Sequence, residues 1–96
     1  MIEHTVTFSL KHRLKSDEER DFLAAAALLA GIPGVRDFAI RRQVSAKLPH
    51  AFGITMRFAS RADYEAYNTH PLHLSFVDER WLKEVEDFQE ADFESL

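Results

Sequence analysis

Residues 2–11 alternate between apolar and polar side chains, with His4 the one exception, and this alternation limits the folds open to the chain more than any other feature. A period of two residues is typical of a β-strand that turns one face to the core. His4 lies on the apolar face, together with Val6 and Phe8. The sequence therefore predicts a strand whose core face carries one imidazole among apolar side chains.

Similar patterns along the chain predict the remaining elements. Ser16 and the acidic residues after it are typical of a helix start, and Gly31 is typical of a helix end. Pro71 is expected to break the helical pattern before it, because a residue that precedes proline avoids the helical conformation. The stretches with helical patterns are residues 17–31, 61–68 and 76–85. The stretches with strand patterns are residues 2–11, 35–44, 52–58 and 87–93.

This order of elements, β-α-β-β-α-β, predicts an α+β fold of the ferredoxin-like class in a single domain over residues 1–96. Its sheet has four antiparallel strands, and its helices cover one face. The second face carries small or mildly polar side chains, which suit a second sheet better than open water. We therefore expect a homodimer in which two sheets pack into a dimeric α+β barrel. The side chains of this second face are Thr5, Thr7, Ala39, Ala51, Gly53 and Thr55.

Composition excludes several classes of function. The chain has no cysteine, so it has neither a disulfide framework nor a thiolate nucleophile. Its formal net charge of −4 disfavours nucleic acid as a partner. No apolar run approaches the roughly 20 residues of a membrane span. The amino-terminal pattern is unlike a signal peptide, so we expect a cytoplasmic protein.

Four motifs, in order and at matching separations, resemble the stress-responsive A/B barrel (Dabb) family over nearly the whole chain. They are His4-Thr5-Val6-Thr7-Phe8, Pro33-Gly34-Val35-Arg36-Asp37-Phe38, Phe58-Ala59-Ser60 and Tyr67-x-x-His70-Pro71-x-His73-x-x-Phe76. The resemblance implies a dimeric α+β barrel. The family includes a ring-forming, stress-associated plant protein and a plant polyketide cyclase.

The resemblance to the cyclase also implies candidate site residues. Its catalytic tyrosine and histidine fall on Tyr67 and His73, and a pocket histidine of its first strand falls on His4. Phe52 stands where the cyclase has a further pocket histidine, which is a departure from its pattern. Phe52 and Phe76 are expected to line the pocket with His4. In an aldol cyclisation the histidine would remove a proton next to a carbonyl and the tyrosine hydroxyl would stabilise the oxygen.

Each candidate also has a purely structural interpretation. His4 fits a buried ring that is satisfied by a hydrogen bond, and Tyr67 fits the core. His73 fits either a pocket wall or a loop contact, whereas His70 fits a helix cap before Pro71. No metal or other cofactor is expected. Histidines 12 and 50 are interpreted as solvated, as are the acidic residues between 84 and 94.

Three functions remain open at this point. The first is binding of a small hydrophobic or aromatic compound between sheet and helices, with or without acid–base catalysis of the cyclase kind. The second is a non-enzymatic, stress-associated or assembly role for a stable homo-oligomer. The third is a cofactor-free monooxygenase, which rests on analogy of fold alone.

Overall fold

Four antiparallel strands form one sheet in the computed structural model, which describes residues 1–96. The strands are β1 (Ile2–Leu10), β2 (Arg36–Arg42), β3 (Phe52–Phe58) and β4 (Val85–Phe93), in the spatial order β2-β3-β1-β4. β1 and β3 form the centre of the sheet, with His4 opposite Met56 and Val6 opposite Ile54. This arrangement confirms the predicted ferredoxin-like fold.

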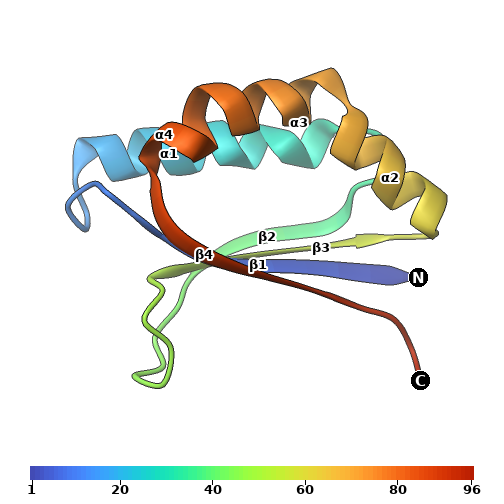
Figure 1. Cartoon of the computed structure of the whole chain (residues 1–96), viewed down its shortest axis with the longest axis horizontal. Coiled ribbons are helices and arrows are strands. Elements are labelled where there is room, and N and C mark those ends of the chain that lie inside the picture. Colours follow the sequence, from blue (N-terminus) through green and yellow to red (C-terminus); the bar gives the residue numbers. More distant parts are fainter.

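The helices all lie on one face of the sheet (Figure 1). α1 (Asp17–Ala27) continues into a 3₁₀ turn, η1 (Leu28–Gly31). α2 (Arg61–Thr69) is followed by α3 (Pro71–Phe76), a π-helical turn η2 (Val77–Trp81) and the short α4 (Leu82–Glu84). This second helical segment forms a roof over β1, β3 and β4.

Side-chain caps fix where the helices begin. The hydroxyl of Ser16 accepts a hydrogen bond from the backbone N–H of Glu19, and that of Ser60 accepts one from Asp63, both at 3.2 Å. His70 caps α3 through its Nδ1 atom, which accepts from the Leu72 N–H at 3.1 Å. Such caps satisfy backbone donors that a helix leaves unpaired in its first turn. The interpretation of His70 as a cap is confirmed.

Several predicted boundaries were wrong by a few residues. The short helical segment begins at Pro71 rather than at residue 76 and ends at Glu84, and β4 begins at Val85. β2 is shorter than residues 35–44, and its pairing register with β3 shifts within the strand, between Arg36 and Ala39. No helix of the chain is long and apolar enough to cross a membrane.

An aromatic cluster holds the helices to the sheet. The ring of Phe8, which is fully buried, lies 5.9 Å from that of Phe22 on α1, 5.4 Å from that of Phe52 on β3 and 4.9 Å from that of Trp81 on η2. These contacts join β1, β3 and two helical segments at one place. Burying such large rings is the main favourable contribution to folding.

The opposite face of the sheet is bare. Thr5, Thr7, Gly53 and Thr55 are only half-buried there. The loop between β2 and β3 and the carboxyl terminus both project on this side of the sheet (Figure 1). Between them lies a surface of small side chains.

We predict that Phe8→Ala lowers the free energy of unfolding by roughly 3–5 kcal/mol, because it removes a buried ring and leaves a cavity. Chemical denaturation followed by circular dichroism measures this change. Leu14→Ala is the matched control, since Leu14 is 59% exposed and should change stability little. Similar destabilisation by both substitutions would contradict the central role of Phe8.

Candidate functional site

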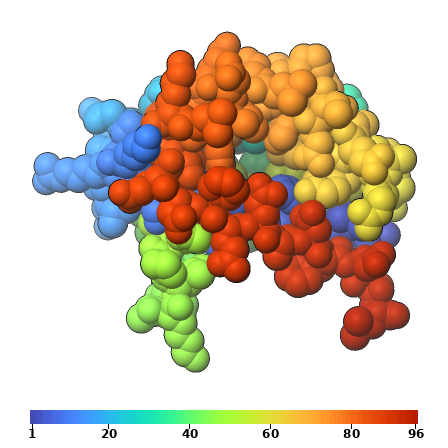
Figure 2. Space-filling model, viewed as in Figure 1, coloured from blue at the N-terminus to red at the C-terminus, as the bar shows by residue number.

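A cavity of about 270 Å³ lies between the sheet and the roof. The roof residues that line it fall between Tyr67 and Leu82. Figure 2 shows its mouth as a hollow between β4, in red, and the helices above it, in orange and yellow. Ten of its 14 lining residues are hydrophobic, which suits a small apolar compound. The lining residues are His4, Val6, Leu29, Ile54, Met56, Tyr67, Asn68, His73, Phe76, Val77, Trp81, Leu82, Phe88 and Glu90.

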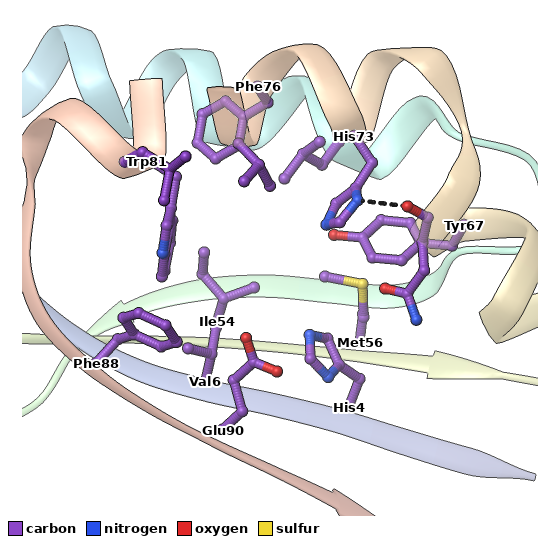
Figure 3. A pocket seen from close by; sticks show the side chains of 14 residues that line it. His4, Val6, Ile54, Met56, Tyr67, His73, Phe76, Trp81, Phe88 and Glu90 are labelled. Atoms are coloured by element: carbon purple, nitrogen blue, oxygen red, sulfur yellow. Dashed lines mark hydrogen bonds between the residues drawn. The ribbon is translucent and has the colours of Figure 1, made fainter. Parts of the chain in front are cut away.

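Four of the five predicted site residues meet at this cavity. His4 rises from β1 at its floor, whereas Tyr67, His73 and Phe76 descend from α2 and α3 (Figure 3). Phe52 does not line the cavity. Its side chain is buried beside Phe8, in the aromatic cluster, with the guanidinium of Arg42 over its ring.

His73 has a fixed tautomer when it is neutral. Its Nδ1–H donates to the backbone carbonyl of Asn68 at 3.0 Å, because a carbonyl can only accept. Burial lowers the pKa of the imidazole below its ordinary value of 6.5, and His4 adds to this effect. The carbonyl of Asn68 and the carboxylate of Glu90 oppose it. At neutral pH the Nε2 atom therefore carries a lone pair.

The Tyr67 ring lies against the ring of His73, with centroids 4.5 Å apart. Tyr67 is buried, and its hydroxyl forms no hydrogen bond within the chain. Burial raises the pKa of this hydroxyl far above its ordinary value of 10.0, and the nearby Tyr64 and Glu90 add to the shift. Tyr67 therefore remains a hydrogen-bond donor without a protein partner.

His4 is held by a polar network that the sequence analysis missed. Its Nδ1–H donates to Asp92 Oδ1 at 2.6 Å, and the Tyr64 hydroxyl donates to Asp92 Oδ2 at 2.9 Å. The Tyr64 oxygen lies 3.0 Å from the same Nδ1. Burial and the hydrogen bond to Asp92 raise the pKa of Tyr64 to about 12. When the ring is neutral, these contacts leave the Nε2 atom of His4 as its free acceptor.

The interpretation of the other histidines as solvated was wrong. His50 is buried, with its Nδ1 2.7 Å from the Thr7 hydroxyl and its Nε2 2.7 Å from Asp87. His12 is half-buried, and its Nε2 lies 2.7 Å from Glu84. The sequence hides these pairs because the partners are far apart along the chain.

The interpretation of the acidic carboxyl-terminal residues as a solvated surface was also wrong in part. Asp87 and Asp92 each pair with a histidine, and Glu84 pairs with both His12 and Arg80. Glu90 is exposed, as expected, but it also lines the cavity. Its position could have been found from the alternation along the last strand, which places it on the same face as Asp92. No group of three His, Cys, Asp or Glu side chains is placed to hold a metal ion.

Trp81 reaches the cavity through the π-helical turn η2. A π turn inserts one extra residue into a helix and is frequent at functional sites. The edge of the Trp81 ring faces Phe88 of β4, with centroids 5.5 Å apart. The side chains of the roof and β4 thus meet at one end of the cavity mouth.

Comparisons with known proteins agree with this fold. The sequence profile of the stress-responsive A/B barrel domain matches residues 2–95. A Dabb family protein of Mesorhizobium loti with a ferredoxin-like fold is 48% identical; the alignment covers 99% of this chain and 96% of that one, with a TM-score of 0.96. Among curated proteins, none matches this chain.

Two more distant structures share the fold alone. A hydroxynitrile lyase of Passiflora edulis is 17% identical, with 96% of this chain and 90% of that chain covered and a TM-score of 0.81. A dimeric ferredoxin-like protein of unknown function from Thermobifida fusca is 19% identical, with coverage of 98% and 90% and a TM-score of 0.79.

We predict that His73 titrates below 6.5, because burial disfavours its charged form. Glu90→Gln should lower the pKa of His73 further, since it removes a charge that favours the imidazolium. Two-dimensional ¹H–¹⁵N NMR over a pH series measures both values and shows the tautomer. A pKa at or above 6.5, or an upward shift in the variant, would contradict the arrangement of the cavity.

Proposed function

The chain belongs to the stress-responsive A/B barrel domain family, and on this basis we propose that it binds a small hydrophobic or aromatic compound in the cavity and acts on it by acid–base catalysis. The observation that carries this proposal is the pairing of His73 with Tyr67. A free imidazole lone pair and a free phenolic donor lie side by side on the wall of an apolar cavity.

These two groups suit removal of a proton next to a carbonyl. The His73 Nε2 lone pair takes the proton from carbon, and the electrons of the C–H bond move toward the carbonyl oxygen. The Tyr67 hydroxyl donates a hydrogen bond to that oxygen as its negative charge grows. The enolate carbon can then attack a second carbonyl carbon, which is the bond-forming step of an aldol cyclisation. The π electrons of that carbonyl move to its oxygen, and the His73 imidazolium returns its proton there. The low polarity of the cavity strengthens the hydrogen bond to the oxygen.

His4 is the third polar ring of the proposed site. Asp92 and Tyr64 fix its orientation, so its Nε2 is a ready acceptor for a hydroxyl of the bound compound. We assign it a binding role. Phe52, which lies outside the cavity, has no part in this proposal.

The other two functions have less support. A cofactor-free monooxygenase rests on similarity of fold alone, which does not determine a reaction. A purely assembling protein needs no cavity with unpaired polar groups. The hydroxynitrile lyase of the same fold shows that this architecture can hold an active site.

We further propose that the chain forms a homodimer through the bare face of its sheet. Thr5 and Thr55 are paired neighbours at the centre of this face, and both are half-buried. Small side chains allow a second sheet to approach to the usual distance of about 10 Å. The Thermobifida fusca protein of the same fold is dimeric, which supports formation of a dimer.

Tyr67→Phe should leave binding within about threefold of the unchanged protein but slow proton exchange by about 10²–10³-fold, because it removes only the donor to the oxygen. His73→Ala should abolish exchange. Binding of aromatic ketones is followed through Trp81, the single tryptophan of the chain, which lines the cavity. Exchange of the protons next to the ketone carbonyl for deuterium is followed by NMR.

His70→Asn is the control for these variants. His70 does not line the cavity, and asparagine retains a capping acceptor for α3. Exchange at the rate of the unchanged protein in His73→Ala, with its fold intact, would rule out the proposed base.

Thr55→Arg should convert the dimer to a monomer, because an unpaired charge buried between two sheets costs roughly 3–5 kcal/mol. Sedimentation velocity at micromolar concentration measures the change. Thr69→Arg adds the same charge at an exposed position of α2 and should leave the dimer intact. A monomeric unchanged protein at that concentration would refute the assembly.

A further inference from the structure

The charged groups of the cavity are unbalanced. No lysine or arginine lines it, whereas Glu90 does. Figure 3 shows the Glu90 side chain rising from β4 between Phe88 and His4, with its carboxylate toward the cavity. The nearest guanidinium on the roof, that of Arg80, is engaged by Glu84 and by Asp21. When the imidazoles of His4 and His73 are neutral, a ligand in this cavity therefore meets a negative charge and no positive one.

The hydrogen-bonding groups show the same preference. Nδ1 of His73 is occupied by the Asn68 carbonyl and Nδ1 of His4 by Asp92, so both rings present an Nε2 acceptor. The carboxylate of Glu90 is an acceptor as well. The donors among the lining side chains are the Tyr67 hydroxyl, the Asn68 amide and the indole N–H of Trp81. The cavity thus accepts more hydrogen bonds than it donates.

We infer that the cavity selects neutral compounds that carry a hydroxyl group and a carbonyl group, and that Glu90 excludes the corresponding carboxylates. This inference rests on the proposed function, because it names the class of compound that the same cavity takes. A carboxylate there would lose its hydration without gaining a cation, and it would stand close to the charge of Glu90. A hydroxyl donates to the free acceptors instead, and a carbonyl accepts from Tyr67.

The effect of Glu90 on the pKa values of Tyr67 and His73 agrees with a carboxylate that faces the cavity. Its charge raises the pKa of the Tyr67 hydroxyl, after the larger effects of burial and of Tyr64. It also favours the imidazolium of His73, against the larger effect of burial. The carboxylate is therefore close enough to the catalytic pair to act on a ligand between them.

The test compares 3-hydroxyacetophenone with 3-hydroxybenzoate at pH 7.5 by isothermal titration calorimetry. The two compounds have nearly the same size, and they differ in a neutral acetyl group against a carboxylate. The unchanged protein should bind the benzoate at least about tenfold more weakly than the ketone, a difference of roughly 1.4 kcal/mol. In Glu90→Gln the dissociation constants of the two compounds should differ by no more than about threefold.

Glu65→Gln removes the same charge from an exposed position of α2 and should keep the full difference in affinity. Equal binding of both compounds by the unchanged protein would overturn the inference and leave the proposed function standing. If the difference in affinity between the two compounds is the same in Glu90→Gln, Glu90 is not its cause, and the inference is likewise overturned. Binding of neither compound, nor of other aromatic ketones, would refute the proposed function and this inference with it.

Discussion

The packing of Phe8 against α1 and η2 determines the spacing between the sheet and its helices, and the cavity depends on that spacing. At this end of the molecule aromatic rings from both layers fill the space completely. At the other end, the rings of Tyr67 and His73 lie side by side in the roof, and the cavity lies between them and the sheet. A closely packed region thus supports an open one, as a functional site on a small domain requires.

The elements that could be predicted are those whose pattern is local. Alternation along residues 2–11 placed His4 on the core face, and Ser16 and His70 were found as caps because a cap acts within a few residues. The family resemblance predicted that Tyr67 and His73 belong to one site, and both line the cavity.

What could not be predicted depends on long-range pairing or on a change of helical period. Asp92 supports His4 from 88 positions away, and Tyr64 completes the contact from another element. Trp81 enters the cavity because a π turn alters the helical phase, which a search for regular spacing cannot detect. His50 was interpreted as a solvated residue near a loop, but two strands, β1 with Thr7 and β4 with Asp87, supply partners for its two nitrogens.

β4, an edge strand, carries Phe88, Glu90 and the carboxylate of Asp92 that holds His4. It is also the element of the sheet that the ribosome synthesises after all the others. Until it emerges, β1 lacks a partner along one edge, and the His4 imidazole has no carboxylate to orient it. The nascent chain can therefore pack its aromatic cluster first, and the walls of the cavity are complete only after β4 has been synthesised.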